Sequence, residues 1–291
     1  MMEKANKVQD RSFSQVYLII LVLALMYSLP GCKEDMKDVY KKAMKAYEAE
    51  DYQKASKSFE KIVEKYPNHS LCLKARLELG KMYLYKLKQP EKALKHLQDL
   101  YANSQPGTYS MEALKLIGHI YDTSLNNCPK AIDAYRLLVQ NYASEIDASA
   151  YQLSIADCYF KLLDYGNAMT EYQALVEKYP ESVQLPRAKF QIANNYALQE
   201  DWESSIALQE ELLHSGTLSE QLRAETELEL AFGYEQTERF EEALALYEEL
   251  LNIDFNVVII DVALLERKIE RVQEAIKESK KGPSKVDWKR K

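Results

Sequence analysis

The side chains best suited to catalysis or metal binding are few in this 291-residue sequence and lie far apart along the chain. No two histidines are four residues apart, and no two cysteines form the C-x-x-C spacing of many zinc and redox sites. The residues concerned are His69, His96, His119, His214, Cys32, Cys72, Cys128 and Cys158. The sequence also lacks the G-x-S-x-G, Walker and H-E-x-x-H motifs of common enzyme classes. We therefore expect a protein that is not an enzyme, with no catalytic residues, no metal site and no cofactor.

Cys32 follows a segment whose composition predicts export. Lys4, Lys7 and Arg11 precede an apolar run over residues 16–29. This run is shorter than the roughly 20 residues that a membrane-spanning helix needs. A positively charged start followed by a short apolar run is typical of a secretory signal.

The segment ends in Leu29-Pro30-Gly31-Cys32, which resembles the bacterial lipobox. The resemblance implies that residues 1–31 are a signal peptide and that Cys32 becomes the lipidated first residue, held in the membrane by more than one acyl chain. Pro30 departs from the lipobox pattern, and an uncleaved signal anchor is the alternative. Lys33 follows the cysteine, where aspartate retains enteric lipoproteins at the inner membrane. We expect an outer-membrane lipid anchor facing the periplasm, with inner-membrane anchoring as the alternative.

A repeat of 37 or 38 residues organises the rest of the chain. Residues 51–67 and 164–180 show it best, with a small residue, an aromatic residue four positions later, an aliphatic residue three positions after that, and a final Tyr-Pro. This spacing predicts one apolar stripe on a helix that the proline ends. The small residue recurs as Ala55, Ala93, Ala131, Ala168, Ser205 and Ala243, and a second small column lies 12 or 13 residues upstream at Ala43, Gly80, Gly118, Ala156, Ala193 and Ala231. Each unit therefore predicts two helices, called A and B here, that meet through small residues.

This pattern resembles the tetratricopeptide repeat, with small-x-x-Tyr in helix A, Ala-x-x-x-aromatic in helix B and a late proline. The resemblance implies an all-α fold, an α-solenoid of about six helix pairs over residues 32–255, in which stacked neighbours bury the core. Six unrelated helical hairpins are the alternative. The fifth unit fits least well, because Ser205 and Gln209 replace its small and aromatic residues. The predicted pairs are 36–49 with 52–65, 71–87 with 90–102, 109–125 with 129–141, 146–163 with 165–178, 184–199 with 202–214, and 219–236 with 240–252.

The end of the chain departs from the repeat. Residues 256–279 have the pattern of one longer amphipathic helix, expected to cap the array, with a partner-binding helix as the alternative. Residues 280–291 are basic and are expected to be disordered. The net charge is −7, of which residues 1–31 contribute +1 and residues 280–291 contribute +5, so that residues 32–279 carry −13. Such an acidic body repels phosphate backbones, and we expect no nucleic-acid partner.

Surface recognition is then the expected function. In tetratricopeptide arrays the A helices line the concave side, so residues near the small column of helix A are predicted to form a groove for an apolar segment of a partner protein, with no small-molecule substrate. The six apolar members of this set are expected to be exposed, because the core does not need them. The predicted groove residues are Leu77, Lys81, Leu84, Lys115, His119, Leu153, Asp157, Phe160, Phe190, Asn194 and Phe232.

Cys128 and Cys158 are predicted to approach each other. Cys128 begins the third B helix, Cys158 lies near the end of the fourth A helix, and neighbouring helices run antiparallel. A disulfide requires Cα atoms within about 7 Å. A disulfide and two separate thiols both remain open on the sequence alone.

The combination of a lipobox with Tyr-Pro repeat units resembles the outer-membrane assembly lipoproteins of the BamD family. The stretches that carry this resemblance are A-E-D-Y-Q-K-A-S-K-S-F-E-K-I-V-E-K-Y-P-N-H-S and Y-Q-A-L-V-E-K-Y-P-E-S. The resemblance implies a lipid-anchored scaffold that acts in outer-membrane protein assembly. The chain departs from that family in having six units rather than five. A type IV pilus pilotin-like protein, a Tol-Pal-associated periplasmic adaptor and an accessory binding protein for cell-wall enzymes are the alternatives.

Overall fold

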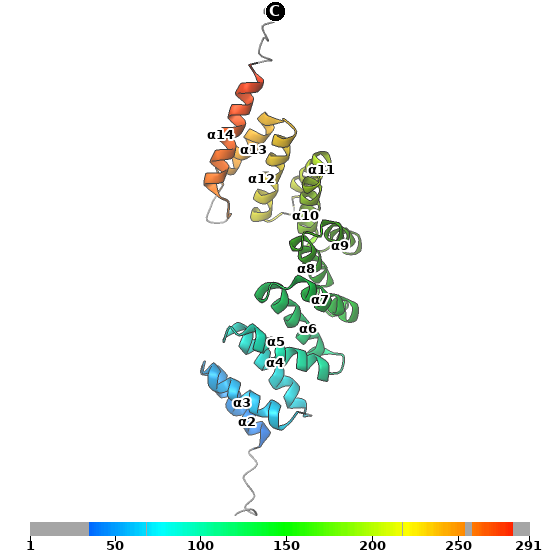
Figure 1. Cartoon of the computed structure of the whole chain (residues 1–291), viewed down its shortest axis with the longest axis vertical. Helices are drawn as coiled ribbons and strands as arrows, with labels where there is room; N and C mark the ends of the chain where they lie inside the picture. Colours follow the sequence, from blue (N-terminus) through cyan, green and yellow to red (C-terminus); the bar gives the residue numbers. More distant parts are fainter. Residues whose placement is uncertain (1–34, 68, 217, 254–257, 282–291) are drawn as a thin grey trace, which may run out of the picture. The chain divides into compact units, whose positions relative to one another are not determined.

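The computed structural model describes residues 35–67, 69–216, 218–253 and 258–281, which form α-helices and one π-helical turn without any β-strand among them (Figure 1). The chain divides into two compact units, residues 1–89 and 90–291. The predicted signal peptide, Cys32 and most of the basic tail lie outside the described residues.

The first unit holds three helices, α2 (Met36–Glu48), α3 (Tyr52–Lys65) and α4 (Ser70–Tyr85). Helix α3 packs against both α2 and α4. These are the first A helix, the first B helix and the second A helix of the predicted repeat.

In the second unit each helix packs against the next along the chain. Its B helices are α5 (Pro90–Asn103), α7 (Cys128–Tyr142), α9 (Tyr165–Lys178), α11 (Trp202–His214) and α13 (Phe240–Leu250). Its A helices are α6 (Thr108–His119), α8 (Ala148–Lys161), α10 (Leu185–Leu198) and α12 (Glu220–Gln236), followed by a last helix α14 (Val262–Ser279). The predicted all-α architecture of paired helices is confirmed. The doubtful fifth unit also forms its pair, with Ser205 and Gln209 both buried at 1% exposure.

Each turn from helix A to helix B contains one residue in the left-handed backbone region. In three of these turns the following aspartate ends one helix and begins the next. The backbone N–H groups of Asp51, Asp164 and Asp201 donate to the carbonyl five residues earlier, at 2.9 to 3.0 Å. Their carboxylates accept the N–H three residues later, at 3.1 to 3.2 Å. This is a Schellman-type helix end joined to an N-cap, and it holds the two helices of a pair in one register.

The third A helix differs from the prediction. The range 109–125 was expected to be one α-helix, but the α-helix ends at His119 and a π-helical turn follows over Ile120–Ser124, labelled η1. Gly118 and Ala131 are 13 residues apart rather than 12, but Gly80 and Ala93 have the same spacing without a π-helical turn, so the spacing alone does not explain the turn. A π-helical turn accommodates an extra residue within a helix.

The small column of helix A is explained by close packing. Ala156, Ala193 and Ala231 have no exposed surface. A Cβ atom added at Gly118 would lie 2.4 Å from the ring of Tyr135, which belongs to the aromatic column of helix B. The ring of Tyr135 therefore needs a small residue opposite it, as the sequence predicts.

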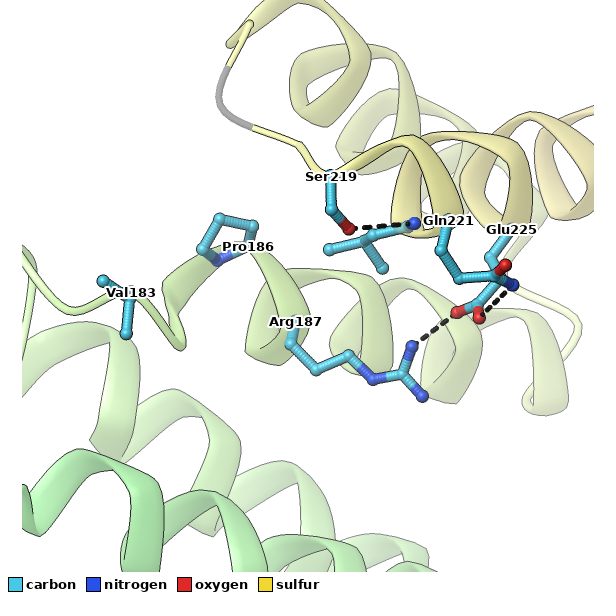
Figure 2. Close-up of a pocket in the computed structure, with 7 residues that line it drawn as sticks. Val183, Pro186, Arg187, Ser219, Gln221 and Glu225 are labelled. Carbon is cyan, nitrogen blue, oxygen red and sulfur yellow. Dashed lines mark hydrogen bonds and ion pairs between the residues drawn. The ribbon is translucent and has the colours of Figure 1, made fainter. Parts of the chain in front are cut away.

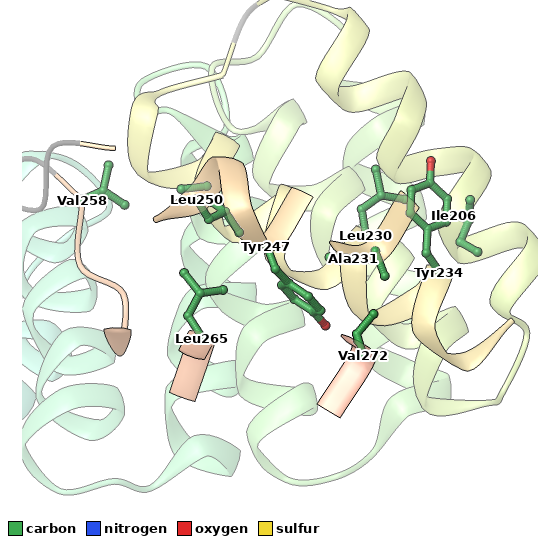
Figure 3. Close-up of a cluster of buried hydrophobic side chains, with 11 residues drawn as sticks. Ile206, Leu230, Ala231, Tyr234, Tyr247, Leu250, Val258, Leu265 and Val272 are labelled. Carbon is green, nitrogen blue, oxygen red and sulfur yellow. The ribbon is translucent and has the colours of Figure 1, made fainter. Parts of the chain in front are cut away.

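Two apolar clusters show how the second unit is held together. One is centred on Tyr172 and Leu175 of α9, both without exposed surface, and includes Ala156 and Ile192 of the A helices on either side. The other joins α12, α13 and α14 (Figure 3). Leu265 and Val272 of α14 are fully buried in it. Helix α14 thus covers the apolar side of the last B helix.

A tyrosine in helix A also bonds to the B helix of the preceding repeat. In the first unit the hydroxyl of Tyr83 donates to Glu60. In the second unit Tyr234 donates to Glu210 at 2.6 Å, and Tyr121 accepts from Gln98 at 3.0 Å. Burial, together with the bond to Glu210, raises the pKa of Tyr234 to about 12, so this hydroxyl remains protonated in neutral solution.

Candidate functional site

Three residues of the predicted groove are buried rather than exposed. Leu77 and Leu84 are 7% exposed and Phe190 is 4% exposed. The expectation that they present apolar surface is wrong. An A helix is packed on more than one side, as α10 is against both α9 and α11, so its apolar stripe is wider than the small column alone.

The first three charged or polar members of the set lie on α4 and α6. Lys81 lies on α4, in the first unit, and is partly exposed. Lys115 on α6 pairs with Glu112 one turn before it, at 2.9 Å. His119 is exposed at the end of α6.

Helix α8 presents three members of the set on one side. Leu153, Asp157 and Phe160 lie three or four residues apart and are all partly exposed. The ring of Phe160 packs edge-on against Tyr165, with the ring centroids 5.3 Å apart. Asp157 accepts a hydrogen bond from the hydroxyl of Tyr172 at 2.6 Å. Burial raises the pKa of Asp157, and the bond from Tyr172 opposes that rise.

The equivalent positions on the next two A helices are also partly exposed. On α10, the Asn194 amide donates to Gln191 at 3.3 Å, while its carbonyl oxygen is buried without a hydrogen-bond partner among the described residues. On α12, the ring of Phe232 packs edge-on against Trp202, and the Lys268 ammonium lies 4.5 Å from the Phe232 centroid. We call Leu153, Asp157, Phe160, Asn194 and Phe232 the A-helix face.

A pocket of about 350 Å³ lies at the start of α10 and α12 (Figure 2). Its apolar lining comes from Val183, Pro186 and Leu222. Val183 is 82% exposed at this pocket.

A polar network forms the other wall of this pocket. The Arg187 guanidinium donates to the Glu225 carboxylate at 2.5 Å (Figure 2). The Gln221 amide donates to the same carboxylate at 2.9 Å. The pocket thus offers apolar surface beside a fixed ion pair.

Sequence reasoning missed this pocket. The available signal was that Arg187 and Glu225 occupy equivalent positions of consecutive A helices, 38 residues apart. Opposite charges one repeat apart indicate a direct contact between neighbouring helices.

Cys128 and Cys158 lie close together, as predicted. Both are buried free thiols, and their sulfur atoms and a carboxylate oxygen of Asp122 all lie within 4.8 Å of one another. The repeat pattern does not place Asp122 beside them, because it predicts a continuous α-helix where Asp122 lies in a π-helical turn.

Among the described residues, no helix is both long and apolar enough to cross a membrane.

Two family models for the tetratricopeptide repeat match residues 40–108 and 150–182. The fold is that of the tetratricopeptide repeat. A tetratricopeptide repeat protein from Parabacteroides merdae has a similar structure, with a TM-score of 0.57 and 18% identity over 86% of this chain and 94% of that one. A MamA RS-1 double mutant is similar at a TM-score of 0.50 and 15% identity, over 62% of this chain and 92% of that one.

PilW, whose structure is described as that of a widely conserved type IV pilus biogenesis factor, aligns with a TM-score of 0.49 and 16% identity, over 75% of this chain and 93% of that one. No curated protein matches the sequence. The two family models and the Parabacteroides merdae structure establish the tetratricopeptide-repeat fold.

Proposed function

We propose that this tetratricopeptide-repeat protein is a lipid-anchored scaffold of the bacterial cell envelope, which binds partner proteins through its A helices and acts in outer-membrane protein assembly. The fold supports the scaffold role, because stacked helix pairs expose extended surfaces for binding other proteins. The lipobox-like end at Cys32 and the resemblance to BamD-family lipoproteins support the envelope role.

The observation that carries the binding role is the pocket at the start of α10 and α12. Val183, Pro186 and Leu222 can accept an apolar side chain of a partner, and the Arg187–Glu225 pair beside them can bond to its backbone or polar groups. Ligand sites combine apolar walls with a few fixed polar groups in this way. The A-helix face adds Phe160 on α8 as an aromatic anchor.

Double substitution of Phe160→Ala and Val183→Ser is expected to reduce capture of the partner by at least about tenfold, since anchor residues contribute roughly 2 kcal/mol or more and about 1.4 kcal/mol is a factor of ten. Both side chains are exposed at least in part, so helix content should remain unchanged. The measurement is quantitative recovery of barrel-assembly components with the full-length protein from detergent-solubilised membranes.

Leu137→Ser is the matched control, because Leu137 is a 39% exposed apolar residue on the B helix α7. It should leave recovery at the wild-type level. Equal recovery with the folded double variant would show that partners bind elsewhere. Recovery of pilus or Tol-Pal proteins in place of barrel-assembly components would refute the assignment to outer-membrane assembly while keeping the binding site.

A further inference from the structure

We propose that Asp122, Cys128 and Cys158 form a binding site for a thiophilic divalent cation such as Zn²⁺. One ligand atom from each of the three side chains lies within 4.8 Å of the other two. The residues come from three consecutive elements, η1, α7 and α8, so the fold and not the local sequence assembles the site.

The distances suit a tetrahedral ion. Zinc binds sulfur at about 2.3 Å and carboxylate oxygen at about 2.0–2.2 Å, which places a sulfur and an oxygen ligand about 3.6 Å apart in a tetrahedron. The Cys158 sulfur lies 3.7 Å from Oδ1 of Asp122. Three protein ligands leave a fourth position for water or for another donor.

The elements hold the three ligands in place. Cys128 is the first residue of α7, after the N-cap residue Asn127, and it is 3% exposed. Cys158 is fully buried on α8. Asp122 lies in the π-helical turn η1, and such turns frequently occur at functional sites.

Lys161 supplies a positive charge beside the Asp122 carboxylate. Its ammonium donates to Oδ1 of Asp122 at 2.7 Å, which fixes the carboxylate as hydrogen-bond donors commonly fix metal-binding carboxylates. With two thiols, one carboxylate and one ammonium, the empty site is neutral. When a divalent cation displaces the two thiol protons to solvent, two thiolates, the carboxylate, the cation and Lys161 again sum to zero. The cluster, in which the two thiols are buried and Lys161 is exposed, therefore carries no net charge in either state.

The third donor favours a cation over a disulfide. A disulfide would use only the two sulfur atoms, and Asp122 and Lys161 would have no part in it. The Cys158 thiol instead donates towards the Asp122 carboxylate.

The test is titration of the full-length, detergent-solubilised and reduced protein with Co²⁺, which reports thiolate ligands and tetrahedral geometry in its absorption spectrum. The expected result is about one tightly bound Co²⁺ per chain, displaced by Zn²⁺, together with a rise in melting temperature when Zn²⁺ is added. Cys128→Ser and Cys158→Ser should each abolish the sulfur-to-cobalt band, and Asp122→Asn should weaken binding at least about tenfold.

Cys72→Ser is the matched control, because Cys72 is a buried free cysteine at 1% exposure that lies in the first unit. It should keep the full spectrum. No cobalt band in the reduced wild-type protein, or the same band in a folded Cys128→Ser, Cys158→Ser double variant, would overturn the proposal. Protein isolated from cells with a mass lower by two hydrogens and no free thiol at either position would show a disulfide and would also overturn it.

Discussion

Replacing Tyr172 by alanine is expected to destabilise the protein by about 3–5 kcal/mol, the usual cost of removing a large buried aromatic side chain. Tyr172 has no exposed surface and lies in a cluster to which α8, α9 and α10 all contribute. Its loss would leave a cavity among three helices, which cannot all close on it. Urea denaturation followed by circular dichroism measures this effect.

Tyr172→Phe separates the ring from its hydroxyl. It keeps the packing and removes only the hydrogen bond to Asp157, at a cost of about 1–3 kcal/mol when that carboxylate is charged. If Tyr172→Ala is no more destabilising than Tyr172→Phe, the ring does not have the structural role described.

The cost of Tyr172→Phe should also depend on pH. Burial places the folded-state pKa of Asp157 above its unfolded value, so this carboxyl favours folding most below its unfolded pKa, and that contribution is lost as pH rises through the folded pKa. The bond from Tyr172 limits the loss by stabilising the charged form. The difference in unfolding free energy between wild type and Tyr172→Phe is therefore expected to be larger at neutral than at acidic pH.

Cys32→Ser is expected to abolish lipidation completely. In the proposed function, the lipobox-like sequence would make Cys32 the acceptor of the acyl chains and the residue before which residues 1–31 are removed. Labelling with a fatty-acid analogue should disappear, and the protein should remain a larger precursor. Cys72→Ser should change neither property. Unchanged labelling of Cys32→Ser would exclude Cys32 as the lipidated residue.

The repeat register could be obtained from the sequence because it depends on local rules. The B helices α3, α9 and α11 have the predicted bounds, since an N-cap aspartate begins each one, and in α3 and α9 a Tyr-Pro pair follows the end. The small columns were also foreseen, because a residue such as Gly118 must lie opposite a ring.

Local sequence rules could not predict which side chains of the A helices are buried. Phe190 lies outside the small column of helix A, so its side chain was predicted to be exposed. It is buried instead, with the Arg187 guanidinium 5.2 Å from its ring centroid. Which side of a helix is buried depends on the neighbouring repeats, and a single helix pattern does not contain that information.

The remaining features of the candidate sites depend on contacts between repeats. Arg187 and Glu225 meet because α10 and α12 lie side by side, and Asp122 lies near Cys128 in a π-helical turn that the repeat pattern does not predict.

Site-specific photo-crosslinking in living cells tests the central claim, that partner proteins bind the A helices, most directly. A photoreactive amino acid would be placed singly at position 160 on α8, at position 183 beside the pocket, or at position 137 on the B helix α7. We expect positions 160 and 183 to crosslink to the same envelope-assembly protein, and position 137 not to crosslink to it. Crosslinks to that protein from position 137, with none from positions 160 and 183, would contradict it.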